Sequence, residues 1–376
     1  MSDGRKNVVV VGGGPAGTMI CRQLSKKLDR QRFNLILVTE RPYYTHLPAS
    51  IRMVVSSEGN LEETIHMPYD NLFRNGKNGK VIIARATRVE EDEANEGGVV
   101  FLNTGEEIEY TLLVVATGCT WEGPLDLPGA KDEEKKWVDE WREKFAAAED
   151  VVIVGGGSVG IEFAGEIRDL ESSKRITIVH DQDLLLNDAY SAKFRNLAMN
   201  NIHKRGVEVI LGDAIPDLEI SPANTIRTAK GRLLVADLVI PCRGPRPNTD
   251  FLNDLTDHPL TQAGHVRVTP TLQVFRHPRI LAAGDIIEWD DQKQMIKYPA
   301  HAGVITHTVL DVLNGRDPNH FYKGSYERIV ISNGRKGGVS YYTYWGPRVQ
   351  FGDQVSSKVA KGKVLKKGFA RQALGL

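Results

Sequence analysis

The sequence that decides the fold is Val8-Val9-Val10-Val11-Gly12-Gly13-Gly14-Pro15-Ala16-Gly17, and it recurs as Val151-Val152-Ile153-Val154-Gly155-Gly156-Gly157-Ser158-Val159-Gly160. In each copy a run of β-branched residues predicts a strand that is buried on both faces. Gly-x-Gly-x-x-Gly follows at once, and the residues after it have the apolar spacing of a helix. A strand–turn–helix unit with this loop is typical of dinucleotide binding, and two copies in the same context indicate two such units.

The three glycines of each loop have separate roles. The first permits the tight turn from strand to helix, the second lets a pyrophosphate approach the backbone, and the third lets the helix pack closely on the strand. The anion then lies at a helix N-terminus, where N–H groups and the helix dipole favour negative charge. We therefore predict cofactor contacts from Gly12, Gly13, Gly14, Pro15, Ala16 and Gly17 in the first loop, and from Gly155, Gly157 and Gly160 in the second.

An acidic residue at the end of the next strand distinguishes the two units. In the first unit the strand over residues 33–39 ends in Glu40, which is placed to accept hydrogen bonds from the ribose hydroxyls of an adenosine. In the second unit the strand over residues 175–179 is followed by His180 and Asp181, with no glutamate at the expected place. Asp181 is a candidate partner for the ribose of NADH, but the missing glutamate equally admits the 2′-phosphate of NADPH. The sequence leaves this choice open.

Three later segments resemble the junctions of flavoproteins with two dinucleotide sites. Residues 110–115 predict a strand that leads into Ala116-Thr117-Gly118, which resembles the crossing from the FAD domain to the NAD(P)H domain. Residues 238–248, which include Gly244, resemble the return crossing. Gly284-Asp285 resembles a late element in which the aspartate contacts the ribityl and pyrophosphate region of the flavin.

The order of these elements predicts an α/β fold with a discontinuous FAD domain. Two Rossmann-like dinucleotide-binding domains are expected, the NAD(P)H domain being inserted into the FAD domain, together with a small C-terminal α+β domain. We place the FAD domain at residues 1–122 and 246–320, the NAD(P)H domain at 123–245 and the C-terminal domain, with its basic tail, at 321–376.

Nearly the whole chain resembles the apoptosis-inducing-factor homologues called ferroptosis suppressor proteins, which are relatives of type II NADH dehydrogenases. Besides the elements above, the segments 44–52, 81–86, 157–162 and 332–339 are similar to those of the family. The resemblance implies FAD contacts from Arg52 and from the backbone of Ala86, a carboxylate near the nicotinamide at Glu162, and an ionisable side chain near the flavin ring at His46. The segment 297–303 differs from the animal members.

The resemblance implies a flavin-dependent oxidoreductase that takes hydride from NADH or NADPH and passes electrons to a quinone-type acceptor. Glu162 and His46 are the candidate catalytic residues. Two alternatives stay open: a reductase of a ferredoxin-like protein, and a redox-sensing cell-death factor with slow turnover. Bound cofactors supply the hydride chemistry in each case, while the protein supplies positioning and electrostatics.

The composition limits the partners and the cellular location. Lys plus Arg equals Asp plus Glu at 48 each, which argues against electrostatic binding of nucleic acid. The three cysteines include no Cys-x-x-Cys pair, so we expect no redox dithiol and no metal site. The N-terminus lacks the apolar core of a signal peptide and has no glycine at position 2, so we expect neither secretion nor N-myristoylation. We expect a monomer or homodimer.

The C-terminal segment 355–376 has six basic residues and no acidic ones, with apolar residues between them. Such a pattern suits an amphipathic element on an anionic membrane surface, although a solvated tail that packs over the active site is an equal alternative. We therefore expect a cytoplasmic protein that can be peripheral on a membrane or a lipid droplet, and mitochondrial association is compatible with the sequence.

Overall fold

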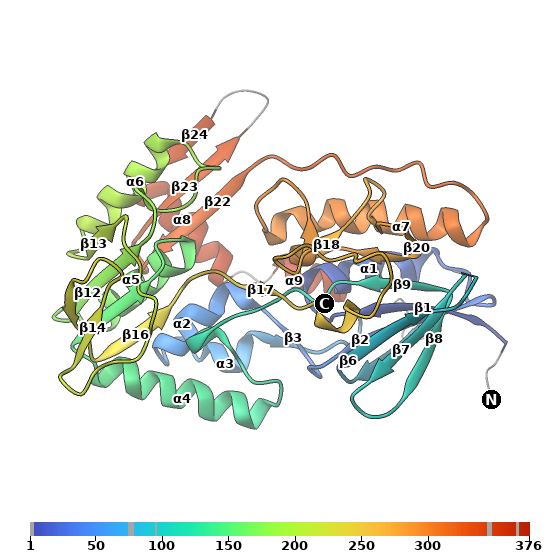
Figure 1. The fold of residues 1–376 in the computed structure, drawn as a ribbon, viewed down its shortest axis with the longest axis horizontal. Coiled ribbons are helices and arrows are strands. Elements are labelled where there is room, and N and C mark those ends of the chain that lie inside the picture. The colour runs from blue at the N-terminus through green and yellow to red at the C-terminus, as the bar shows by residue number, and fades with distance from the viewer. Residues whose placement is uncertain (1–3, 74–78, 95, 344–347, 366–367) are drawn as a thin grey trace.

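The protein has two lobes, each built around its own mostly parallel β-sheet, and extended chain segments join them (Figure 1). The computed structural model describes residues 4–73, 79–94, 96–343, 348–365 and 368–376. In the view of Figure 1 the lobe that contains β1 lies on the right, and the lobe that contains β12 lies on the left.

The first lobe is built on a six-stranded sheet in the order β19-β20-β9-β1-β2-β5. Val8, Val9 and Val10 of β1 are completely buried, as expected for a central parallel strand that is covered on both faces. Helices α1 and α7 pack against each other over the sheet, and a three-stranded antiparallel sheet, β6-β7-β8, adds to the same core. The elements are β1 (Lys6–Val11), α1 (Pro15–Lys27), β2 (Phe33–Thr39), β5 (Lys80–Ile83), β6 (Ala86–Glu91), β7 (Gly98–Leu102), β8 (Glu107–Tyr110), β9 (Leu112–Val115), β19 (Gln273–Val274), β20 (His277–Ala282) and α7 (Tyr298–Leu313).

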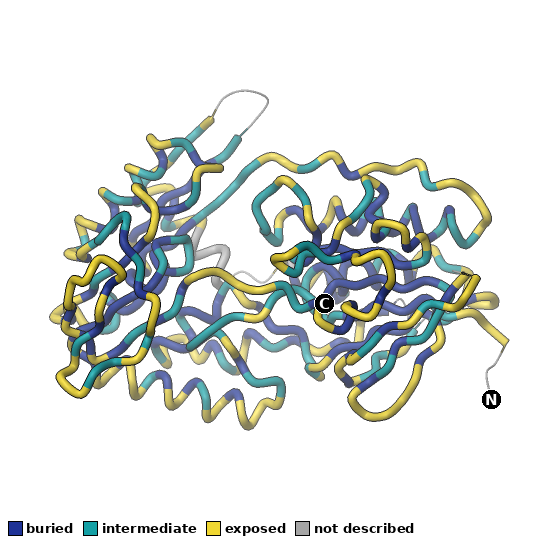
Figure 2. Tube along the Cα trace, in the orientation of Figure 1, coloured by how far each residue is buried: buried dark blue, intermediate teal, exposed yellow. Residues whose placement is uncertain are grey.

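The second lobe repeats the unit on a four-stranded parallel sheet in the order β13-β12-β11-β16. Figure 2 shows the central strands of both sheets as continuous buried segments, whereas α4 alternates between buried and exposed residues along its length. The elements are α4 (Lys131–Ala147), β11 (Asp150–Val154), α5 (Ser158–Leu170), β12 (Arg175–His180), α6 (Ala192–His203), β13 (Glu208–Leu211), β14 (Thr225–Arg227), β15 (Leu233–Val235) and β16 (Leu238–Pro241).

The two crossings between the lobes run side by side as a short antiparallel ribbon. Strand β10 (Cys119–Thr120) pairs with β17 (Arg246–Pro247). The ribbon is extended by a 2.6 Å hydrogen bond from Thr117 Oγ1 to the carbonyl of Asn248, and by a 2.9 Å bond from the Asn248 N–H to the carbonyl of Gly118. Strand β20, which follows the return crossing, lies next to β9 in the first sheet. The predicted fold, with one nucleotide domain inserted into another, is confirmed.

One segment of the N-terminal stretch crosses to the second lobe earlier than the predicted boundary at residue 122. Helix α2 (Ser50–Val55) buries Met53 and Val54, and helix α3 (Leu61–Thr64) buries Leu61, in the core of the second lobe, not of the first. The guanidinium of Arg142 on α4 holds the segment through bonds to the Met53 and Ser56 carbonyls and to Glu62. The predicted FAD-domain stretch 1–122 therefore contains a segment, residues 49–65, that packs in the second lobe.

The C-terminal stretch also divides between the lobes. Strands β22 (Arg328–Asn333), β23 (Gly337–Thr343) and β24 (Arg348–Phe351) form an antiparallel sheet that packs with α8 (Asp353–Leu365) against the second lobe. Helix α9 (Gly368–Leu374) instead packs on α1 of the first lobe and buries Ala370, Ala373 and Leu374 there. In Figure 1 a long strap from the end of α7 to β22 spans both lobes.

The predicted amphipathic basic tail lies partly outside what the structure describes, because the side chains of residues 360–367 and 369 are not described. Within the described ranges, no helix combines the length and the apolarity that crossing a membrane requires. The remaining short elements are β3 (Tyr44–Thr45), η1 (Leu47–Ala49), β4 (His66–Met67), η3 (Gly123–Leu125), η4 (Asp250–Leu252), β18 (Val266–Arg267), η5 (Gly284–Ile286), β21 (Ile287–Glu288) and η6 (Met295–Lys297).

Candidate active site

The first and third glycines of each loop fill the roles that the sequence predicts. Gly12 has φ +115° and Gly155 has φ +118°, values that favour glycine. A Cβ on Gly12 would collide with the carbonyl of Ala116, and one on Gly155 would collide with the carbonyl of Cys242. Both loops therefore turn directly against a crossing segment. A Cβ on Gly17 would collide with the Gly12 carbonyl, and Gly160 stands in the same relation to Gly155.

The middle positions Gly14 and Gly157 are open, as a pyrophosphate site requires. No heavy atom lies within 4 Å of a Cβ built at either position. Each residue is the N-cap of its helix, α1 or α5, and neither helix has a side-chain cap. The first backbone N–H groups of both helices are thus presented to an approaching anion, which fits the pyrophosphate of a dinucleotide.

Strand register places Asp181 where the first unit has Glu40. Val11, just before the first glycine, pairs with Val38, and Val154 pairs with Val179 in the second unit. In both units the N–H of the first glycine donates to the paired valine carbonyl, at 2.8 Å. Glu40 and Asp181 each follow that valine by two residues and are exposed. The structure thus brings both acids to the same edge of their sheets.

The Gly284-Asp285 element lies against the first loop and is held by α7. A Cβ on Gly284 would lie 3.2 Å from the Ala16 Cβ. The hydroxyl of Tyr298 donates to Asp285 Oδ1 at 2.5 Å, and the Gly284 N–H donates to Nδ1 of His301 at 3.1 Å. Burial raises the pKa of Asp285 and lowers that of His301 to about 4. His301 is therefore neutral near pH 7, with its proton on Nε2.

The role of α7 in holding Asp285 was not predicted from the sequence. Segment 297–303 differs from the animal members of the family, and no role was expected of Tyr298 or His301. The two residues lie three apart near the N-terminus of a helix, so they face the same side. A polar pair at this spacing after a Gly-Asp element is the signal that sequence reasoning could have used.

A buried cation lies behind the same element. Lys297 is 1% exposed, and its Nζ lies 2.5 Å from Glu327 Oε1 and 3.7 Å from Asp291 Oδ2. Tyr322 donates its hydroxyl to Asp291 at 2.6 Å, and its ring stacks edge-on against His301 with centroids 4.5 Å apart. The strap residues Tyr322 and Glu327 are thus fastened to the loop that follows Asp285.

Two residues that were expected near the cofactors have other partners in the structure. The Arg52 guanidinium bonds to Glu166 on α5 at 3.0 and 2.8 Å, which joins α2 to the second lobe. Glu162 Oε1 accepts from both the N–H and the hydroxyl of Ser332, at 2.9 Å each. The structure therefore gives Arg52 and Glu162 roles in fixing chain segments to α5.

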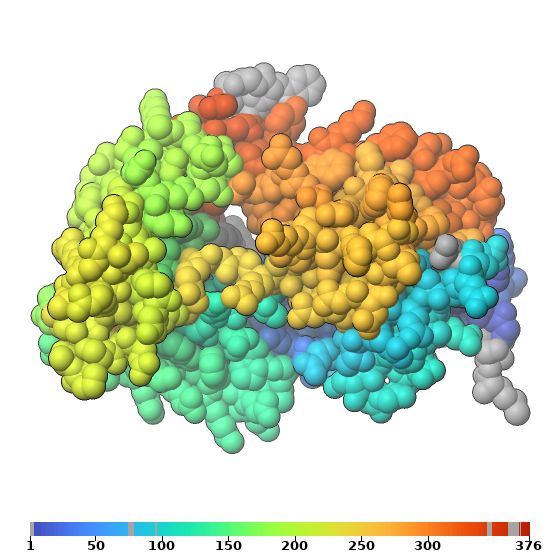
Figure 3. All heavy atoms as spheres, in the orientation of Figure 1, coloured from blue at the N-terminus to red at the C-terminus, as the bar shows by residue number. Residues whose placement is uncertain are grey.

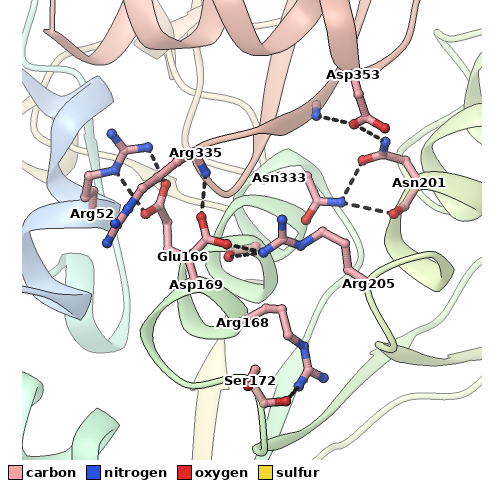
Figure 4. A network of polar contacts seen from close by, with 12 residues as sticks. Arg52, Glu166, Arg168, Asp169, Ser172, Asn201, Arg205, Asn333, Arg335 and Asp353 are labelled. Atoms are coloured by element: carbon pink, nitrogen blue, oxygen red, sulfur yellow. Dashed lines mark hydrogen bonds and ion pairs between the residues drawn. The ribbon is translucent and has the colours of Figure 1, made fainter.

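Figure 4 shows the Arg52–Glu166 contact together with the neighbouring polar contacts that dock the C-terminal hairpin. The hairpin joins β22 to β23, with Asn333 paired to Gly337 at its end. Asp169 accepts from the Arg335 N–H at 2.6 Å and forms an ion pair with Arg205. A Cβ on Gly165 would collide with the Gly334 backbone, so helix and hairpin meet backbone to backbone.

The remaining predicted residues are distributed along both lobes. His46 is 2% exposed and precedes η1, and its backbone N–H donates to the Ile65 carbonyl at 2.9 Å. Ala86 begins β6 in the first lobe, and Gly244 has φ +100° on the return crossing. In the space-filling view the surface is hollowed between the lobes, close to this crossing (Figure 3).

The fold and the paired glycine loops define a two-dinucleotide oxidoreductase. The chain belongs to the pyridine nucleotide-disulphide oxidoreductase family, whose model matches residues 6–305. It is 43% identical over 294 residues to the FAD-dependent oxidoreductase FVFD30 of Flammulina velutipes, covering 78% of this chain and 90% of that protein. The predicted cofactors, FAD and a nicotinamide dinucleotide, are those of this family.

More distant relatives extend the likeness over the whole chain. Ferroptosis suppressor protein 1 of Homo sapiens is 28% identical over 357 residues, covering 90% of this chain and 89% of that protein. Among solved structures, the sulfide:quinone oxidoreductase of Aquifex aeolicus matches with a TM-score of 0.79 at 16% identity, covering 98% of this chain and 92% of that one. This last likeness concerns the fold alone.

Proposed function

We propose that the protein is an FAD-dependent NADH:quinone oxidoreductase. The observation that carries the proposal is the repetition, in both lobes, of an open second glycine and an exposed acid at the same strand position. Two dinucleotide sites of this kind on one chain serve to bring a flavin and a nicotinamide together.

The environment of Asp181 favours NADH over NADPH. A carboxylate at this strand end accepts hydrogen bonds from ribose hydroxyls and repels a 2′-phosphate. The neighbouring cation, Arg195, is engaged elsewhere, because its guanidinium donates to the carbonyls of Leu184, Leu185 and Leu186. The site thus offers a carboxylate to the ribose and directs Arg195 toward the backbone.

The chain's own groups position the cofactors. Bound FAD supplies the acceptance of hydride and the onward transfer of electrons. The N-terminus of α1 and the open backbone at Gly14 suit its pyrophosphate, Glu40 its ribose, and Asp285 its ribityl region. Tyr298 and His301 fix Asp285 before the flavin binds, so little rearrangement is needed on binding.

A quinone is the proposed acceptor because the chain resembles the ferroptosis suppressor proteins over 90% of its length, and because its thiols do not suit the competing sulfide chemistry. Sulfide chemistry is disfavoured, because burial raises the pKa of Cys119 to about 12 and raises those of Cys21 and Cys242 further. These thiols stay protonated near pH 7 and are weak nucleophiles.

The acceptor is tested by steady-state turnover of the FAD-loaded protein with NADH. Short-chain ubiquinone analogues, a ferredoxin, sulfide and oxygen are compared at equal concentration. We expect turnover of about 1–1000 per second with quinone, as is usual for enzymes, and much slower turnover with the others. Faster reduction of ferredoxin would make the protein a reductase of that partner instead. Slow turnover with every acceptor would favour a redox sensor.

A further inference from the structure

His180 lies beneath the second glycine loop, one residue before Asp181. It is 8% exposed, and a Cβ on Gly156 would lie 2.9 Å from its Cγ. The equivalent residue of the first unit is Thr39, whose Oγ1 lies beneath Gly13 in the same way. The second unit therefore has an imidazole where the first has a hydroxyl.

Both ring nitrogens of His180 face acceptors. Nε2 lies 3.3 Å from the Leu186 carbonyl, and Nδ1 lies 3.3 Å from Asp181 Oδ1. A neutral imidazole has one N–H, so it can satisfy one of these acceptors and turns a lone pair toward the other. The imidazolium form has two N–H groups and satisfies both. The geometry thus fits a charged ring that bonds to the Asp181 carboxylate.

The carbonyl that faces Nε2 belongs to Leu186, a residue with a strained backbone. Leu186 is a buried non-glycine residue with φ +62°, a backbone conformation that is uncommon for its type. Its N–H donates to the Gly156 carbonyl at 2.9 Å, so the loop after β12 folds back onto the glycine loop. Strain of this kind is typical of functional sites, where the surrounding structure fixes it.

Among the described residues, Arg195 and Asp213 are charged groups that contact the surroundings of the ring. Arg195 of α6 donates to the same Leu186 carbonyl at 3.2 Å. Asp213, in the loop after β13, gives its backbone N–H to the His180 carbonyl, while its carboxylate accepts from the N–H groups of Ala214 and Lys230. The glycine-loop residue against the ring, Gly156, has no side chain. The side chain of Asp181 is 72% exposed, and its carboxylate is thus the one that contacts the ring.

We propose that His180 is a specificity-determining residue whose protonation sets how strongly the second site discriminates NADH from NADPH. The inference rests on the proposed assignment of Asp181 to the coenzyme ribose. When the ring is neutral, the Asp181 carboxylate carries its full negative charge and repels a 2′-phosphate. When the ring is protonated, the pair is neutral overall, and a doubly negative phosphate meets less repulsion.

The test measures binding of NAD+ and NADP+ to the oxidised, FAD-loaded protein by calorimetry between pH 5.5 and 8.5. The oxidised coenzymes leave the flavin unreduced. Variants His180→Thr, which copies Thr39 of the first unit, and His180→Gln are compared with the parent. His203→Gln, an exposed histidine at the end of α6 in the same lobe, is the control. Retained NAD+ binding at pH 8.5 shows that the second site of each variant has folded.

For the parent and the control, we expect the ratio of the Kd for NADP+ to the Kd for NAD+ to fall as pH decreases. The 2′-phosphate itself titrates near pH 6, so part of this fall occurs in every protein. The parent should show about fivefold more change than His180→Thr and His180→Gln, the size expected of a partly exposed charge pair.

Two outcomes overturn the inference, and they are distinguishable. Equal pH dependence in the parent and the His180 variants, with NAD+ still preferred, overturns the role of His180 and leaves the proposed function standing. Failure of the parent to bind NAD+, or a preference for NADP+ throughout the pH range, removes the assignment of Asp181 and both proposals with it.

Discussion

Gly14 and Gly157 are single residues at which the two cofactor sites can be tested separately. Because a Cβ at either position meets no atom within 4 Å, substitution by alanine should leave the fold intact. The added methyl occupies the space that we assign to a pyrophosphate. Gly14→Ala should therefore lower FAD affinity at least tenfold and leave NAD+ affinity unchanged, whereas Gly157→Ala should do the reverse. Flavin absorbance per protein and calorimetric NAD+ binding measure the two effects.

Asp181 is the residue at which coenzyme choice should be lost. Asp181→Asn removes the charge but keeps the size of the side chain. We expect about a tenfold rise in the KM for NADH and a smaller gap between NADH and NADPH, since a charged hydrogen bond is worth about 1.5–3 kcal/mol. Asp183→Asn, two residues along the same loop, is the matched control. An unchanged NADH/NADPH ratio in Asp181→Asn would count against the ribose assignment.

His301 should make stability depend on pH. Its pKa in the folded protein is about 4, below the ordinary value of 6.5, so the unfolded chain binds more protons between these values. The free energy of unfolding therefore falls as pH decreases from 6.5 to 4, by up to about 3 kcal/mol from this residue. His301→Asn should show a shallower fall in urea unfolding measured across this range. Parallel curves for the two proteins would contradict this prediction.

The role of a single residue could be predicted from the sequence where that role depends only on neighbouring residues in the chain. The glycine roles follow from backbone geometry within one loop, so the sequence was sufficient for Gly12, Gly14 and Gly17. The partners of Arg52 and Glu162 are Glu166 and Ser332, which tertiary packing brings together from distant parts of the chain. No local pattern specifies such pairs.

At the scale of elements, the C-terminal hairpin depends on glycines at its contact with α5. Gly334 has φ +69°, and a Cβ there would collide with the Asp169 carboxylate. Gly334→Ala should destabilise the protein by about 2 kcal/mol, through backbone strain and crowding together. Gly352→Ala, where a Cβ meets nothing within 4 Å, should change stability by less than about 0.5 kcal/mol. Urea unfolding monitored by tryptophan fluorescence compares them, and equal stability of the two variants would contradict this account.

Elements with strong periodicity were predictable, and those held by tertiary contacts were not. The two β-strand–glycine–helix units and the paired crossings lie where the sequence places them. Helices α2 and α3 are short, and their place in the second core depends on Arg142 reaching three of their groups. The chain enters the second lobe at residues 49–65 and returns to the first lobe before residue 122. A single predicted boundary at residue 122 could not represent this path.

At the scale of the whole molecule, α9 returns the C-terminus to the first lobe. It buries Ala370, Ala373 and Leu374 against the core that contains α1, the helix that follows the first glycine loop. Deletion of residues 368–376 exposes this face of α1. We expect a lower melting temperature by several degrees and faster loss of FAD, with NAD+ binding unchanged. Arg371→Ala, at an exposed position of α9, should leave both properties unchanged.

The proposed electron path is tested by an anaerobic absorbance titration of the purified protein, first with NADH and then with a ubiquinone analogue. We expect an oxidised flavin spectrum that NADH bleaches, with one equivalent per flavin, and that quinone rapidly restores. Bleaching by NADH without recovery on addition of quinone would contradict the proposed acceptor. Failure to bind FAD, even after reconstitution, would contradict the account as a whole.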